Sequence, residues 1–210
     1  IRGNWIEGST GHGISVSTAG IGCVVTVEGN TGSTGTIGRN GLPGNFPDAI
    51  RVTGDGSYII QDNSFDCGFP NGAGIRLNAT NGAIVRRNDV DMNVDSSVGD
   101  AALNLNLQSA GIVVQGTAAD NRIEDNTVSG RARVALSVIY SDFALDKPVG
   151  SSGTPTGTRL ERNDLTGFAG SFGDVDVRRG AAAGQQPADT LYSGRTAAIN
   201  DEGLRTIATA

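Results

Sequence analysis

The segment Ile123-Glu124-Asp125-Asn126-Thr127-Val128-Ser129-Gly130 is the clearest copy of a unit that recurs along the sequence. In this unit an asparagine follows an apolar residue by three positions, and a second apolar residue comes two positions later. The copies are Ile1-Asn4-Ile6, Ile37-Asn40-Leu42, Ile60-Asn63-Phe65, Val85-Asn88-Val90, Ile123-Asn126-Val128 and Leu160-Asn163-Leu165. Internal repetition at such a period predicts a solenoid of stacked coils.

A second unit follows each copy of the first and alternates between apolar and other residues. Its copies are Gly13-Ile14-Ser15-Val16, Ala49-Ile50-Arg51-Val52, Gly74-Ile75-Arg76-Leu77, Gly111-Ile112-Val113-Val114, Ala135-Leu136-Ser137-Val138 and Asp174-Val175-Asp176-Val177. The segment Ala102-Leu103-Asn104-Leu105 fits the fourth place equally well. Strict alternation predicts a strand whose apolar residues face a core and whose intervening residue faces outward.

The two units together predict an all-β chain with two short strands in each period. Strands this short bury their inner faces only by stacking on the next coil, with parallel pairing between coils. The repeated asparagines are expected at the corners, because asparagine tolerates left-handed backbone and its amides can bond in a ladder between coils. We expect about six to seven coils over residues 1–185, with residues 186–210 as a degenerate last coil or a cap.

The repeated asparagine unit resembles that of the right-handed parallel β-helix repeat proteins, the pectin-lyase-like superfamily. The resemblance extends from residue 1 to about residue 180. It implies the fold and leaves the activity open, because this fold carries unrelated functions.

Composition and charge narrow the function further. The chain has 32 glycines and only 5% aromatic residues, which suits short strands and turns. A net charge of −6 argues against a nucleic-acid partner, and no apolar run is long enough to span a membrane. The sequence begins at Ile1, which indicates processing or a place inside a longer protein. Cys23 and Cys67 form either one disulfide or two buried thiols, and we favour the thiols.

Three loop insertions interrupt the regular spacing, and insertions in solenoids often build a binding face. They lie between Val16 and Ile37, between Asn88 and Ile112, and between Val138 and Leu160. The second insertion begins with the row Asp89-Val90-Asp91-Met92-Asn93-Val94-Asp95. If a loop folded them inward, the carboxylates of Asp89, Asp91 and Asp95 would offer the oxygen ligands of a Ca²⁺ site. A straight strand would spread them apart and leave a solvated acidic face, which is the interpretation we favour.

Arg51 and Arg76 occupy the outward position of the second unit in adjacent coils. Guanidinium groups match carboxylates, so the pair would bind either a carboxylated sugar or an aspartate of this chain such as Asp48 or Asp55. For lyase chemistry, a base and a neutralising cation are needed beside the sugar carboxylate. Arg51, Arg76, His12 and Lys147 are the candidates for these roles.

The segment Gly11-His12-Gly13-Ile14-Ser15 resembles one of the polygalacturonase-type hydrolases, in which the histidine lies at the active site. The resemblance implies that Arg51 stands in a substrate-binding segment. The paired aspartates of that family are missing before Gly11, where Glu7 is the only acid. We therefore interpret Gly13-Ile14 as the ordinary start of a strand.

Two functions remain open. We favour a non-catalytic β-helical module of a secreted or cell-surface bacterial protein, acting in adhesion, as a scaffold or in glycan binding. Trp5 and Tyr140 would then supply aromatic contacts to a polysaccharide or cell-surface glycan. The alternative is a lyase, hydrolase or epimerase acting on acidic glycans. Convergence of Arg51, Arg76 and the Asp89–Asp95 row on one surface would favour the enzyme. The sequence does not predict the oligomeric state.

Overall fold

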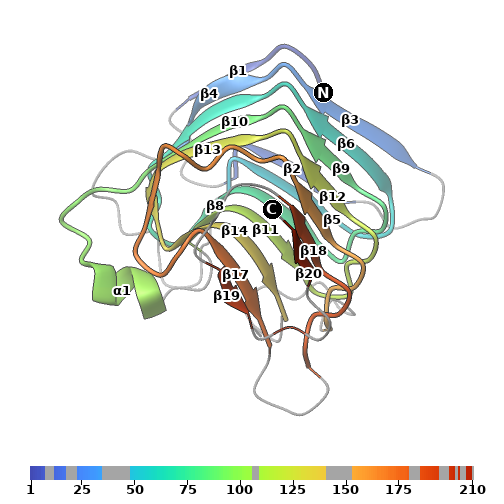
Figure 1. The fold of residues 1–210 in the computed structure, drawn as a ribbon. Helices are drawn as coiled ribbons and strands as arrows, with labels where there is room; N and C mark the ends of the chain where they lie inside the picture. Colours follow the sequence, from blue (N-terminus) through green and yellow to red (C-terminus); the bar gives the residue numbers. More distant parts are fainter. Residues whose placement is uncertain are drawn as a thin grey trace.

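The computed structural model describes residues 1–7, 12–17, 23–34, 48–105, 109–140, 153–179, 185–193, 199–201, 203 and 207–209. Within these residues, short strands pair in parallel into three sheets, here named A, B and C, with seven, six and seven strands. The chain passes from sheet B to sheet C to sheet A in each coil (Figure 1). The predicted right-handed parallel β-helix is confirmed.

Each sheet takes one short strand from nearly every coil. Sheet A contains β3 (Val24–Glu28), β6 (Ser57–Gln61), β9 (Ile84–Arg86), β12 (Arg122–Glu124), β15 (Arg159–Glu161), β18 (Leu191–Ser193) and β20 (Ile207–Thr209). Sheet B contains β1 (Trp5–Glu7), β4 (Thr31–Thr34), β7 (Ser64–Cys67), β10 (Asp89–Asn93), β13 (Thr127–Ala132) and β16 (Phe168–Gly170). Sheet C contains β2 (Ile14–Ser17), β5 (Ile50–Thr53), β8 (Ala73–Asn78), β11 (Ala110–Gln115), β14 (Val134–Ile139), β17 (Val175–Arg178) and β19 (Ile199–Asp201).

The prediction of two strands in each period is wrong, because a full coil has three. The first sequence unit spans a corner, so Ile123 lies in sheet A and Val128 lies in sheet B, with Asn126 between them. The second unit forms the strands of sheet C, and Ile14, Ile50 and Ile75 pair in register. Gly13-Ile14 is therefore an ordinary strand start, as predicted.

The core is a stack of inward apolar side chains from all three sheets. Val85, Ile123 and Leu160 follow one another in register along sheet A, and each is at most 1% exposed. Ile75, Ile112 and Leu136 do the same along sheet C. Burial of each such side chain contributes about 1.5–3 kcal/mol, so this stacking supplies most of the folding free energy.

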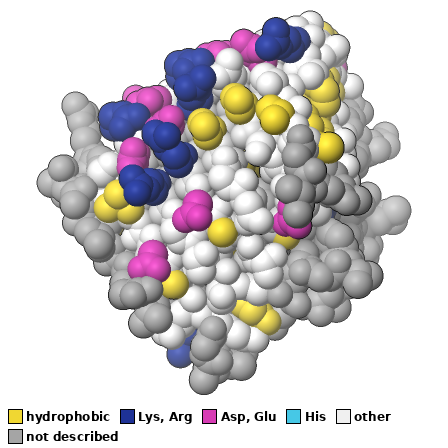
Figure 2. Space-filling model, turned by 90° about the vertical axis from the view of Figure 1, so that its right-hand side faces the viewer, with side chains coloured by type: hydrophobic (Ala, Val, Ile, Leu, Met, Phe, Trp, Pro, Cys, Tyr) yellow, Lys and Arg dark blue, Asp and Glu magenta, His cyan; other side chains and the backbone are white. Residues whose placement is uncertain are grey.

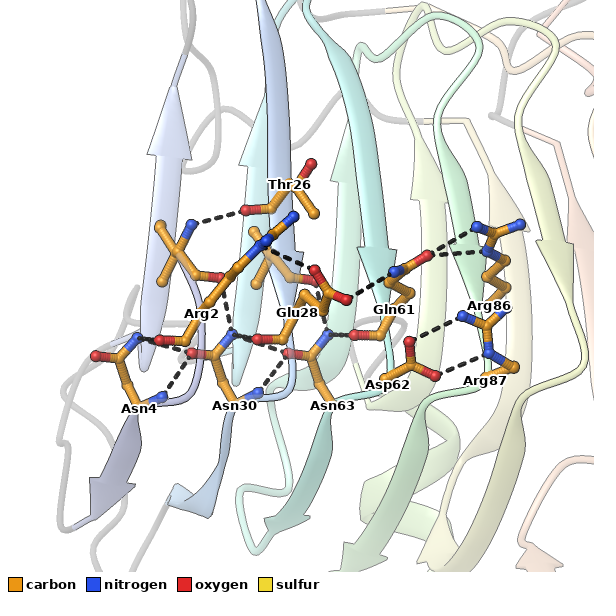
Figure 3. A network of polar contacts seen from close by, with 12 residues as sticks. Arg2, Asn4, Thr26, Glu28, Asn30, Gln61, Asp62, Asn63, Arg86 and Arg87 are labelled. Atoms are coloured by element: carbon orange, nitrogen blue, oxygen red, sulfur yellow. Dashed lines mark hydrogen bonds and ion pairs between the residues drawn. The ribbon is translucent and has the colours of Figure 1, made fainter.

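The corner between sheets A and B carries the predicted asparagine ladder (Figure 3). The side-chain oxygen of each later asparagine accepts two hydrogen bonds from the asparagine one coil earlier. One comes from the Nδ2 group, at 2.8–2.9 Å, and the other comes from the backbone N–H. The rungs are Asn4, Asn30, Asn63, Asn88, Asn126 and Asn163. The structural role expected for the repeated asparagine is thus confirmed at five of the six predicted positions.

The prediction that Asn40 is the rung after Asn4 is wrong. Asn40 lies outside the described residues, and Asn30 occupies the place between Asn4 and Asn63. The pattern search missed this copy because Gly32 stands where the second apolar residue was required. A side chain at Gly32 would collide with the carbonyl oxygen of Ile6 in the neighbouring strand.

The left-handed backbone at this corner belongs to the residue before each asparagine. The φ angles range from 51° to 63°, and the residues are Gly3, Gly29, Asp62, Arg87, Asp125 and Arg162. Non-glycine residues adopt this region at some cost in energy. The asparagine is therefore present for its side-chain hydrogen bonds and not for its tolerance of left-handed backbone.

Charged side chains beside the ladder pair with one another. Arg87 makes two bonds of 2.8 Å to Asp62, and Arg162 bonds Asp125 at 2.8 and 2.9 Å. Figure 2 shows basic and acidic groups side by side along this edge of the molecule. These pairs leave little net charge at the corner.

Two smaller predictions from the sequence are wrong. The alternative copy Ala102–Leu105 is wrong, because these residues belong to helix α1 (Asp100–Leu105) in the second insertion. Cys23 and Cys67 are both free, and only Cys67 is buried, so the expectation of a second buried thiol at Cys23 is wrong. Cys23 stands just before the exposed Val24 at one edge of sheet A.

Strands β18 and β20 extend sheet A and β19 extends sheet C, although the boundary predicted at residue 185 stays a prediction. No helix in the described part of the chain is long and apolar enough to cross a membrane.

Candidate functional site

The residues predicted as functional lie on two different sheets. Arg51 and Arg76 pair in register on the outward side of sheet C, and His12 lies at the same side just before β2. The row beginning at Asp89 lies on β10 in sheet B. The structure therefore brings the basic candidates together but does not bring them to the acidic row. Lys147 lies outside the described residues.

Arg76 is buried and its guanidinium is held on two sides. Its Nε and Nη2 donate to the two carboxylate oxygens of Asp48, each at 2.9 Å, and its Nη1 donates to Gln115 Oε1 at 2.9 Å. The side chains of Arg76 and Asp48 are both 0% exposed. Removing one member of a buried pair leaves an uncompensated charge, at a cost of about 3–5 kcal/mol. Arg76 thus supports the fold, and Asp48 is the intramolecular partner that sequence reasoning named.

His12 lies between Arg51 and Asp48, with its Nδ1 3.5 Å from Asp48 Oδ2. The backbone N–H of Asp48 donates to His12 Nδ1 at 3.0 Å, and Arg51 Nη1 lies 3.3 Å from His12 Nε2. Which of the two ring nitrogens of His12 accepts a hydrogen bond depends on the imidazole tautomer. The His12 side chain is 26% exposed, so this end of the polar row reaches solvent.

A second buried ion pair continues the row toward the C-terminal coils. Arg133 Nη1 donates to Asp176 Oδ2 at 2.7 Å, and both side chains are 0% exposed. The Phe172 ring lies against this pair, 4.2 Å from the Arg133 guanidinium carbon and 4.9 Å from that of Arg178. Cation–π contacts of this kind hold the arginines in place.

Sheet C also carries a second outward column that the sequence analysis missed. Thr53, Asn78, Gln115 and Ile139 follow one another in register two positions after the predicted outward residues. Asn78 and Gln115 are at most 1% exposed. The second unit was defined to end at its second apolar residue. Extending it by one residue would have predicted this column, because the alternation continues there.

The acidic row on β10 faces outward as predicted, with Asp89, Asp91 and Asn93 exposed and Val90 and Met92 buried. Asp66 of β7 lies beside Asp91, and burial together with the Asp91 charge raises the pKa of Asp66. Asp95 lies beyond the strand, where hydrogen bonds from Ser97 hold its pKa below the usual value.

The carboxylates of the row do not converge. Across the described ranges, no group of three or more His, Cys, Asp or Glu side chains is arranged to hold a metal ion. The calcium site, which the sequence analysis gave as the alternative to a solvated acidic face, therefore gains no support from the geometry of this face.

The two aromatic candidates are far apart in the fold. Trp5 is 71% exposed on β1 of sheet B, and its indole N–H donates to Glu7 Oε2 at 3.1 Å. Tyr140 follows β14 of sheet C and accepts a hydrogen bond from Gln185 Nε2 at 2.7 Å. The two residues do not form one aromatic platform.

Comparisons of the chain with protein-family models, with curated proteins and with solved structures find no match.

Proposed function

We propose that the chain is a non-catalytic β-helical module of a secreted or cell-surface bacterial protein, and that it binds glycans. We also propose that it belongs to the pectin-lyase-like superfamily, on the strength of its asparagine corners and its three parallel sheets. An adhesive or scaffolding role is compatible with the same rigid stack of coils.

The proposal rests on the separation of the chemical groups. Acid–base work on a sugar needs its acid and base on either side of one bond, within about 10 Å of each other. Here the basic residues belong to sheet C and the acidic row belongs to sheet B. In addition, Arg76 is bound to Asp48 and Gln115 and is closed off from solvent. In this arrangement Arg76 is not accessible to a substrate, and the acidic row lies on another sheet. Both observations support the binding module over the enzyme.

One contact favours the alternative function, an enzyme that acts on acidic glycans. His12 Nε2 and Arg51 Nη1 lie 3.3 Å apart at the partly exposed end of the row. A guanidinium such as that of Arg51 suits a sugar carboxylate as its hydrogen-bond acceptor.

Incubation with a panel of acidic polysaccharides, with and without Ca²⁺, tests the proposal. Formation of unsaturated products is followed by ultraviolet absorbance, and hydrolysis by new reducing ends. We expect no turnover, together with retention of the protein on a glycan array.

Arg51→Ala is the informative variant, because Arg51 is only partly buried, whereas Arg76→Ala would unfold the coil around Asp48. Turnover that disappears in Arg51→Ala, with an unchanged circular dichroism spectrum, would establish the enzyme in place of the binding module. Absence of both turnover and glycan retention would leave the scaffold role alone.

A further inference from the structure

The N-terminal end of the stack is open at its strand edges and at its core. β1 in sheet B and β2 in sheet C are edge strands, and within the described residues no strand pairs with their outer edges. The inward apolar residues of this end, Ile6, Val16 and Val25, are only partly buried, whereas Val52, which pairs with Val16, is 0% exposed. Unpaired backbone groups and uncovered core residues therefore lie on the same side of the molecule.

Asn4 shows which chemistry would complete this end. The Asn30 side chain accepts two hydrogen bonds from Asn4, and its Nδ2 donates to two backbone carbonyls and to Asn63 Oδ1. In the described chain the Asn4 side chain makes only two bonds, both through Nδ2, to the Arg2 carbonyl and to Asn30 Oδ1. Asn4 Oδ1 is thus an acceptor without the two donors that every later rung receives from the coil before it.

Large apolar side chains lie at the same end. Trp5 belongs to β1 itself and is 71% exposed, and Ile1, just before the corner, is 50% exposed. An unpaired strand edge with exposed apolar side chains beside it is a template for pairing with another strand. The edge of β1 therefore has the properties of an interaction surface.

A second copy of the chain does not fit this surface. Two N-terminal ends would bring acceptor against acceptor at Asn4 Oδ1, with no donor between them. At the other end of the stack the last ladder asparagine, Asn163, follows β15, and β18 and β20 extend sheet A beyond it. These strands keep Asn163 away from the Asn4 of another copy. The surface instead fits a coil whose own asparagine is its outermost rung.

We propose that the N-terminal end of the stack is a docking surface for a polypeptide segment of the same repeat, which adds a parallel coil across β1 and β2. The corner asparagine of that segment donates its backbone N–H and its Nδ2 group to Asn4 Oδ1, as Asn4 does to Asn30. Its apolar residues cover Ile6 and Val16. Addition of a strand to an open sheet edge is a general mode of protein recognition. The inference goes beyond glycan binding and does not depend on it.

A synthetic peptide that copies residues 120–139 is the probe, because it contains the corner asparagine Asn126 between one strand of sheet A and the following strands of sheets B and C. The single tryptophan of the chain, Trp5, lies on β1, so its fluorescence reports binding at this edge. We expect the peptide to shift the Trp5 emission to shorter wavelength. The Asn126→Ala peptide should bind about 5-fold more weakly, and so should the natural peptide when the protein carries Asn4→Ala, because hydrogen bonds at Asn4 Oδ1 are lost.

Thr127→Ala in the protein, an exposed position inside sheet B, is the matched control and should bind the peptide normally. An unchanged Trp5 emission, or equal binding of the natural and the Asn126→Ala peptides, would overturn the proposal. Light scattering of the protein without peptide tests the other occupant, and we expect the mass of a monomer. A stable dimer that Asn4→Ala dissociates would assign the surface to a second copy and would also reject the proposal.

Discussion

At the scale of single residues, the ladder asparagines do more than fill corners. Asn88 accepts the N–H and the Nδ2 group of Asn63, and its own Nδ2 donates to Asn126 Oδ1 at 2.9 Å and to the Ile60 carbonyl at 3.0 Å. Each interior rung therefore joins its own coil to the coil before it and the coil after it. Because these groups are buried, none of the bonds can be replaced by water.

Asn88→Ala is expected to lower the free energy of unfolding by about 2–4 kcal/mol, because it leaves buried partners on both neighbouring coils unpaired. The same change at Asn4, which is exposed, should cost less than about 1 kcal/mol, because water replaces the lost bonds. Urea unfolding of the two variants measures the difference. Equal losses at the two positions would show that burial of the ladder does not set its strength.

At the scale of elements, the corner between sheets A and B combines a strained backbone with paired charges. Asp62, Arg87, Asp125 and Arg162 occupy the left-handed position in four successive coils. The Arg87 and Arg162 guanidinium groups hold the pKa values of Asp62 and Asp125, respectively, below their usual range. Each lowered pKa contributes stability above the ordinary pKa of aspartate, and this contribution is lost as the pH falls through the lowered value.

We therefore expect the natural chain to lose stability between about pH 4 and pH 2, and the double variant Asp62→Asn, Asp125→Asn to lose less over the same interval. Urea midpoints measured at several pH values would show this difference. In about 1 M sodium chloride the difference should shrink, because exposed ion pairs are screened. If the urea midpoints of the two proteins fell equally with pH at low salt, this account would be contradicted.

At the scale of the whole molecule, stability is distributed along the stack. Each coil contacts only the coils before and after it, so an interior coil has two partners and the first has one. In the described chain, three of the four large exposed hydrophobic residues, Ile1, Trp5 and Val24, lie at the N-terminal end of the stack. The strands β8, β11 and β14, in contrast, are buried along their whole length.

Amide hydrogen exchange should therefore be slowest in β8, β11 and β14 and fastest in β1 and β2, each of which is the edge strand of its sheet. Exchange measured by mass spectrometry on peptides from each coil would reveal this gradient. Uniform protection along the stack would mean that the chain opens only as a single cooperative unit.

The solenoid, the parallel pairing and most of the corner asparagines could be predicted from the sequence. This was possible because these features repeat: the same apolar positions and the same Asn63, Asn88 and Asn126 recur in consecutive coils. Where the repeat degenerates, prediction failed. The second rung, Asn30, was not recognised because Gly32 stands where the repeat has an apolar residue. Gly32 is required by the close contact with Ile6 and not by hydrophobic burial.

Which polar residues contact one another follows from the folded chain alone. Arg76 and Arg51 look equivalent in the repeat, yet Arg76 is enclosed by Asp48 and Gln115, which lie 28 and 39 positions away in the sequence. The second outward column, with the unpaired Asn78, and the buried Arg133–Asp176 pair depend in the same way on contacts between coils. A one-dimensional pattern fixes which face a side chain takes, because alternation is local. Burial and pairing on the outer side are set by groups distant in the sequence, and therefore follow only from the folded chain.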